Sequence, residues 1–287
     1  VFMPWISDRF RDMNLSDPQN WNAILKYNYE NLFIMNWSYQ FVYNSRSLGN
    51  SASNYGTNAY TIRLGIETAG NLLYGLSSAS SMKRNADNQH TLFGIAYAQY
   101  AKLDFSFCKS FLINKNNSFA MRAAFGIAAP YGNSDILPYE KRYFSGGANS
   151  VRGWSVRELG PGSFIGNDGR IDFINQTGDI KLDLNVEYRT HLFWKFDGAA
   201  FIDAGNIWTI RDYKEQPGGQ FRIDEFWRQI AVSYGLGIRL NLGYFILRFD
   251  GGMKAIHPSY KDHRKFPIVH PNFKRDFTFH FAVGMPF

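Results

Sequence analysis

Three charged residues could form a buried ion-pair site in this chain of 287 residues. Arg152 lies in a long connecting segment, 130–179, whereas Glu187 and Asp203 lie in two successive segments in which apolar and polar residues alternate. If both segments are strands, the alternation puts the two carboxylates on the same face. A guanidinium can donate two hydrogen bonds to one carboxylate, and these bonds strengthen where water is partly excluded. Segment 130–179 could therefore fold over this face and be held there by Arg152. The alternative is that Arg152 is an exposed loop charge.

Other kinds of chemistry have little support in the sequence. A single Cys excludes a disulfide framework and a multi-cysteine metal site. Three of the six His residues lie in segment 255–275 without the spacing of metal ligands, so we expect no metal and no cofactor. Neither a P-loop nor a Gly-x-Ser-x-Gly motif occurs, and we expect no enzymatic activity. The net charge of +7 is spread along the chain, which suits anionic lipid headgroups better than nucleic acid.

Alternation with a period of two predicts the strands that would position these groups. Leu182, Leu184, Val186 and Tyr188 alternate with charged or polar residues, and a helix would scatter those charges around its circumference. Similar patterns recur along the chain. They predict nine strands near 32–45, 61–67, 102–108, 119–127, 181–189, 196–209, 232–241, 244–250 and 277–287.

A transmembrane antiparallel β-barrel fits these strands best, and a soluble sandwich is the rival. Aromatic residues make up 17% of the chain, the strands are long, and their polar faces carry small residues and charges of both signs. Short turns near 114–118, 193–196 and 241–243 alternate with long connections at 73–95, 130–179, 210–228 and 255–275, as in outer-membrane barrels. Bacterial single-chain barrels have an even number of strands, so an odd count suggests that part of the barrel lies outside this chain. We expect residues 1–30 to form an external loop or short helix and 31–287 the barrel portion.

Two motifs and the last strand resemble the BamA/TamA family of outer-membrane protein assembly factors. Val151, Arg152, Gly153 and Trp154 match that family's Val-Arg-Gly-aromatic motif. Phe201, Asp203 and Gly205 match its Phe-x-Asp-x-Gly motif. Segments 66–73 and 97–104 look most like the branch called TamL, found in Bacteroidetes.

The resemblance implies a barrel of about 16 strands, of which these would be the last nine, preceded by periplasmic POTRA domains. It implies that segment 130–179 enters the lumen and that Arg152 is held there by Asp203 and Glu187, near Phe201 and Gly205. Gly146, Gly147 and Gly153 would let the loop backbone pass close to the wall. The partners implied are client β-barrel proteins, outer-membrane lipid with lipopolysaccharide, and accessory subunits.

The last strand would carry a second function. Phe277, Phe279, Phe281 and the terminal Phe287 resemble the signal that assembly machinery reads, although any lipid-facing strand would look similar. In the family this strand meets the first strand weakly and forms a lateral gate, and Gly284 would weaken pairing there. The implied function is insertion and assembly of outer-membrane proteins by strand templating. A secretion transporter of the same superfamily and a passive diffusion porin are the alternatives.

Overall fold

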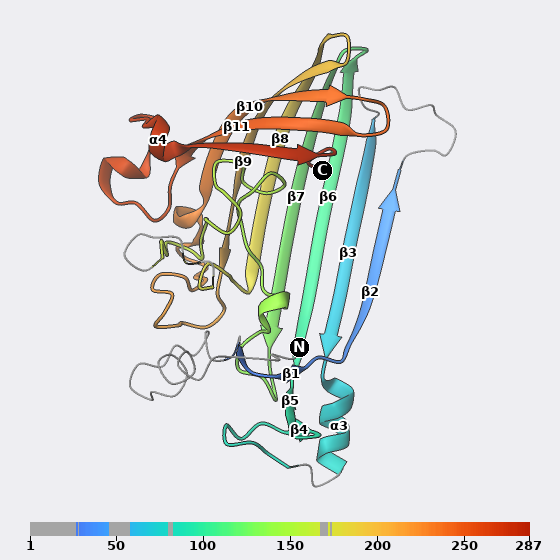
Figure 1. The fold of residues 1–287 in the computed structure, drawn as a ribbon, viewed down its shortest axis with the longest axis vertical. Helices are drawn as coiled ribbons and strands as arrows, with labels where there is room; N and C mark the ends of the chain where they lie inside the picture. The colour runs from blue at the N-terminus through green and yellow to red at the C-terminus, as the bar shows by residue number, and fades with distance from the viewer. Residues whose placement is uncertain (1–26, 28, 46–57, 80–82, 167–171, 173) are drawn as a thin grey trace. The chain divides into compact units, whose positions relative to one another are not determined.

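The chain forms mainly antiparallel strands, as predicted (Figure 1). A computed structural model describes residues 27, 29–45, 58–79, 83–166, 172 and 174–287. Nine strands form one sheet in the order β12-β11-β10-β9-β8-β7-β6-β3-β2. Their bounds are β2 Asn36–Asn44, β3 Ala59–Ala69, β6 Tyr100–Asn114, β7 Asn117–Pro130, β8 Ile180–Phe193, β9 Phe196–Trp208, β10 Ala231–Asn241, β11 Ile246–Ile256 and β12 Phe277–Val283. Each of the nine predicted strands is present in this sheet.

Several strands, such as β6 and β8, extend beyond the predicted ranges, and the ends of β11 and β12 differ for reasons that the residues explain. β11 continues past residue 250 to Ile256, because Gly251 and Gly252 carry no side chains that could show the alternation. β12 ends at Val283 rather than at residue 287. Gly284 has a φ of +92°, a left-handed conformation that leaves the strand, and Pro286 has no backbone N–H to continue pairing.

Short turns and long connections alternate as predicted. β6 is joined to β7, and β8 to β9, by two-residue turns. The long connections hold the short helical turns η1 Tyr139–Lys141, η3 Phe226–Gln229, η4 Asp262–Lys265 and α4 Phe273–Asp276. The expected loop or helix over 1–30 falls mostly outside the described residues, as does segment 46–57. None of the described helices is long and apolar enough to cross a membrane.

Two compact units divide the chain, and the smaller consists of residues 1–40, 65–103 and 127–142. It contains helix α3, Asn71–Ala79, and a small sheet in the order β1-β5-β4. The strands of that sheet are β1 Leu32–Phe33, β4 Thr91–Leu92 and β5 Ile95–Tyr97. Ser77 of α3 lies 3.3 Å from the Tyr97 hydroxyl. The sequence predicted only a loop over 73–95, because strands of two or three residues are too short to show alternation.

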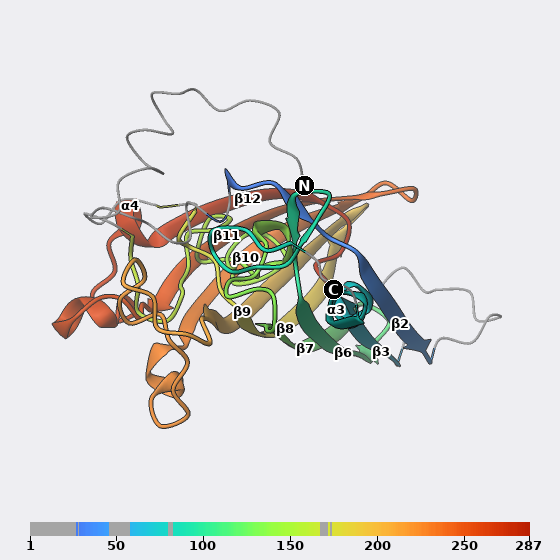
Figure 2. The same cartoon turned by 90° about the horizontal axis from the view of Figure 1, so that it is seen from below.

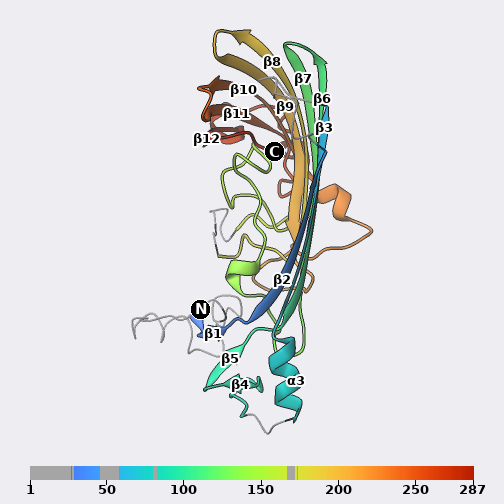
Figure 3. The ribbon, with the colours of Figure 1, turned by 90° about the vertical axis from the view of Figure 1, so that its right-hand side faces the viewer.

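The larger unit, residues 41–64, 104–126 and 143–287, contains β8–β12. One face of these strands is apolar and exposed, as at Ile202 and Leu236, which are 57% and 71% exposed. The other face carries the charges, and Glu187 and Asp203 are completely buried there. Residues 143–166 lie on this inner side of the curved strands β8–β12 (Figures 2 and 3). The exposed apolar surface and the buried charges are therefore on opposite faces of the same strands.

Candidate functional site

The register of β8–β12 aligns the inward side chains in three rows. One row contains Glu187, Phe201, Gly235, Gly252 and Thr278. Beside it runs a row of Asn185, Asp203, Ser233 and Lys254. The row on its other side contains Arg189, Ala199, Gly237, Asp250 and His280. Acidic groups thus stand on β8, β9 and β11, polar groups on β12, and glycines of β10 and β11 leave room between them.

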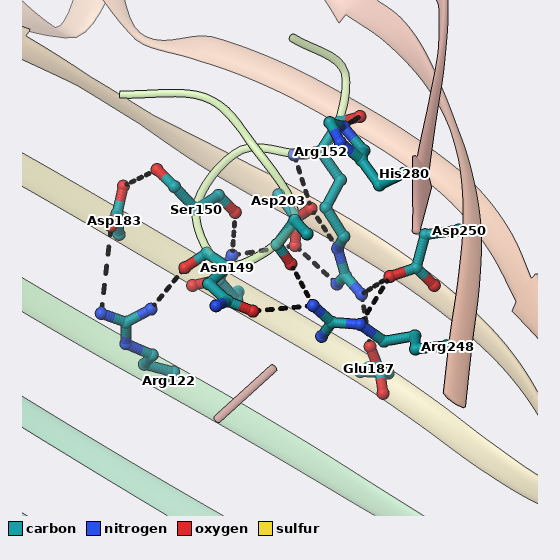
Figure 4. A network of polar contacts seen from close by, with 12 residues as sticks. Arg122, Asn149, Ser150, Arg152, Asp183, Glu187, Asp203, Arg248, Asp250 and His280 are labelled. Carbon is teal, nitrogen blue, oxygen red and sulfur yellow. Dashed lines mark hydrogen bonds and ion pairs between the residues drawn. The ribbon is translucent and has the colours of Figure 1, made fainter. Parts of the chain in front are cut away.

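Arg152 fills this space from the loop and binds two carboxylates (Figure 4). Its Nε and Nη2 donate to the two oxygens of Asp203 at 2.8 and 2.9 Å, a bidentate pair. Its Nη1 donates to Glu187 at 2.5 Å, and its backbone N–H donates to Asp203 at 3.1 Å. The guanidinium carbon lies 3.5 Å from the centre of the Phe201 ring. Arg152 is 1% exposed, so these contacts replace water almost completely.

Glycines bring the loop backbone against the sheet. A Cβ on Gly252 would lie 2.2 Å from the Arg152 carbonyl oxygen, and one on Gly153 would lie 2.6 Å from the Ser233 Cβ. Gly146 and Gly147 act differently, since both have positive φ and face residues 155 and 156 of the same loop. Of the three glycines that were predicted to let the loop pass close to the sheet, only Gly153 therefore does so.

A larger buried charge network surrounds Arg152. Glu187 also accepts from Arg189 at 2.7 Å and from Arg239 at 3.1 Å. A third carboxylate, Asp250, accepts from Arg239 at 2.6 Å and lies 3.2 Å from Arg248 Nε. Burial alone would lower the pKa of Arg152, but the hydrogen bonds and charges of Asp203 and Glu187 raise it above its ordinary value. Arg152 stays charged, and the network holds one more arginine than carboxylates.

The loop tip is held separately. Arg248 donates to the Ala148 carbonyl at 3.0 Å and to the Asn149 side chain at 2.7 Å. From β7, Arg122 donates to the Asn149 carbonyl at 2.8 Å. Ser150 donates to Asp183 at 2.8 Å (Figure 4). The loop is thus attached to β7, β8 and β11 as well as to the strand that carries Asp203.

Trp154 anchors the C-terminal end of the motif 151–154. It is fully buried in an apolar cluster with Val151, Leu159 and Ala231. Its ring lies 5.5 Å from the ring of His257, which stacks on Tyr260 at 3.8 Å. Burial, together with the nearby Lys254 ammonium, lowers the pKa of His257 to about 3. His257, one of the three histidines of segment 255–275, is therefore a neutral, buried part of this anchor.

The structure brings together most, but not all, of the predicted site residues. Arg152 meets Asp203, Glu187 and Phe201, whereas the nearest atoms to a Cβ on Gly205 would be those of Leu182 and Asp183 in β8. Gly205 therefore brings β9 close to β8 and is not a partner of the loop. Arg239, Asp250 and Gly252 were not predicted as site residues. The inward parity of Arg239 and Asp250 was visible in the sequence, but their partners depend on the register, and the alternation did not extend to Gly252.

The C-terminal aromatics divide between the two faces. Phe279 and Phe281 are 59% and 58% exposed and lie against Phe249, so they belong to the outer face. Phe277 stacks on Phe273 at 4.3 Å. Phe287 does not continue the outer row, because the chain turns at Gly284 and its ring comes to lie 5.5 Å from the Arg189 guanidinium. The expectation that Phe287 extends the lipid-facing strand is therefore wrong.

Comparison with known proteins places this geometry in a family. The Omp85 superfamily domain matches residues 9–287. Outer membrane protein assembly factor BamA of Neisseria meningitidis serogroup B is 27% identical over 114 residues, which are 37% of this chain and 13% of that protein. BamA from Haemophilus ducreyi lacking POTRA domains 1–3 has a TM-score of 0.46 and 13% identity, over 88% of this chain and 54% of that one. CdiB from Acinetobacter baumannii has a TM-score of 0.45 and 16% identity, over 87% and 33%.

Proposed function

This chain belongs to the Omp85 superfamily and is an outer-membrane protein, and we propose that it inserts and assembles client β-barrel proteins there. Its similarity to a BamA, which is named as an assembly factor, supports this proposal. The matched region spans only a small part of that relative. The POTRA domains, accessory subunits, contacts with lipopolysaccharide and the TamL branch are therefore proposed on the resemblance alone.

The position of β12 is the observation that carries the proposal. Within the described residues it stands at the end of the nine-stranded sheet and pairs only with β11. Its outer face is apolar and exposed at Phe279, Phe281 and Val283. The backbone groups on its second edge can pair with an incoming strand, which is the chemistry of β-augmentation. A client strand that pairs there would have its own apolar side chains directed toward lipid.

The docked loop supports assembly over diffusion. A diffusion porin needs an open lumen, whereas here Arg152 and Trp154 are buried against the inner face of β8–β12. A secretion transporter would have to release this loop to let its client through. In assembly, the client approaches from the lipid side of β12 and the loop can stay docked. The two mechanisms therefore differ in whether the loop must move.

Reconstitution can distinguish these functions. The intact protein is placed in lipid vesicles, and an unfolded eight-stranded outer-membrane barrel is added outside. We expect the barrel to fold faster than in empty vesicles, as measured by its heat-modifiable mobility on gels. In parallel, a secreted passenger without a barrel is tested for transfer across the bilayer. Passenger transfer without faster barrel folding would replace assembly by secretion.

A further inference from the structure

The edge strand β12 is tied directly to the backbone of the loop motif. The Thr278 hydroxyl donates to the Gly153 carbonyl at 2.9 Å. His280 Nε2 lies 3.0 Å from the Arg152 carbonyl oxygen, a distance at which a protonated Nε2 donates a hydrogen bond (Figure 4). Both side chains are inward members of β12, opposite Gly252 and Asp250 of β11. Neither Thr278 nor His280 belongs to either of the two family motifs.

Arg152 therefore connects opposite ends of the β8–β12 sheet. Its side chain binds Glu187 on β8 and Asp203 on β9. Its carbonyl faces His280 on β12 and would collide with any side chain at position 252. The guanidinium bonds do not require β12, whereas the bonds of β12 to the loop exist only while the motif is docked. The docked loop thus links the charged strands β8 and β9 to the edge strand β12.

We propose that Thr278 and His280 are positioning residues through which the docked loop limits the freedom of the edge strand. Loss of both bonds would leave the loop locked by Arg152 but would let β12 separate more readily from β11. This inference deepens the proposed function, because in that function β12 is the strand that must pair with a client. Its first test uses no client, so it can succeed or fail separately from assembly activity.

Hydrogen exchange of the intact protein in lipid vesicles provides the test. In the double variant Thr278→Val, His280→Phe, the amides of β12 should exchange roughly tenfold faster, since each lost hydrogen bond contributes modestly to the free energy that holds β12 in place. The amides of loop residues 147 and 154 should keep their wild-type rates, because the Arg152 contacts remain. His280→Gln can still donate to the Arg152 carbonyl and should restore most of the protection given by position 280. Thr209→Val is the matched control, since Thr209 is buried and its hydroxyl has no hydrogen-bond partner among the described residues.

Two results would overturn the proposal. One is β12 exchange in the double variant equal to that of the Thr209→Val control. The other is a parallel increase throughout β8, β9 and β12, which would indicate general loss of stability and not release of one strand. Failure of the proposed function would appear differently, as wild-type protein that does not accelerate client folding whatever the exchange of β12.

Discussion

Arg152→Ala should release the loop from the inner face of β8–β12. The variant loses the bidentate bonds to Asp203 and the bond to Glu187. Glu187 keeps Arg189 and Arg239 as partners, so most of the lost stabilisation is that of the buried Asp203 carboxylate. In the docked state, Asp203 would retain the hydrogen bonds from the Asn185 side chain at 2.9 Å and from the backbone N–H of residue 152. Removing one partner of a buried ion pair costs about 3–5 kcal/mol.

That cost corresponds to a decrease of about 100-fold or more in the equilibrium between docked and released loop. Hydrogen exchange can measure it at the amides of residues 147 and 154, which bond to Trp154 and Val151 within the loop. Arg222→Ala is the matched control, because the Arg222 side chain is 60% exposed and its ion pairs are on the surface. We expect that control to change stability by less than about 0.5 kcal/mol.

The source of the cost can be tested by combining substitutions. Asp203→Asn in the Arg152→Ala background removes the orphaned charge, so the double variant should lose much less than the sum of the single variants. Arg152→Lys should be intermediate, since an ammonium cannot form the bidentate pair. A rate of hydrogen exchange in the loop of Arg152→Ala within about twofold of the Arg222→Ala control would show that the Arg152–Asp203 pair does not hold the loop. A buried pair of this geometry cannot be removed at so small a cost in free energy.

Three further predictions follow from the same contacts. Gly252→Ala should displace the loop while β10 and β11 stay paired, because the new Cβ would meet the Arg152 carbonyl at 2.2 Å; exchange should rise in the loop and not in these strands. The anchor around Trp154 should weaken as pH falls from about 6.5 toward 3, because the released state of His257 binds a proton at its ordinary pKa of 6.5 and the docked state only near 3. Exchange corrected for its intrinsic pH dependence should show this, and His257→Phe should abolish it. Leu236→Lys should destabilise the sheet by about 2–4 kcal/mol in lipid, measured by urea unfolding in vesicles, whereas an effect near zero would mean that this face does not contact hydrocarbon.

The alternation of side chains predicted the sheet because it depends only on neighbouring residues. It assigned all nine strands and put Glu187 and Asp203 on one face. It failed where side chains are absent or strands are short, as at Gly251 and Gly252 in β11 and in the strands of the small sheet. Contacts between residues far apart in the sequence could not be predicted from the alternation. Arg239 and Asp250 were visible as inward residues, but only the register of β10 on β11 brings them together.

The C-terminal end and His257 show that local sequence patterns do not predict where the backbone turns or which loop residues become buried. Phe287 has the right parity for the outer row, but the backbone at Gly284 turns before it is reached. His257 lies in a loop sequence typical of exposed residues, and it is buried because Trp154, about a hundred residues earlier, packs against it. The contacts of Thr278 and His280 likewise depend on a loop that docks from far away in the sequence.

In the function that we propose, the loop locked by Arg152 supports assembly of clients at β12. The most direct measurement is the folding rate of an unfolded outer-membrane barrel in vesicles that contain wild-type protein, Arg152→Ala or Arg222→Ala. We expect that Arg222→Ala accelerates folding as wild type does and that Arg152→Ala loses most of the acceleration while remaining inserted. Wild-type acceleration by Arg152→Ala, in protein whose loop is shown by exchange to be released, would contradict it.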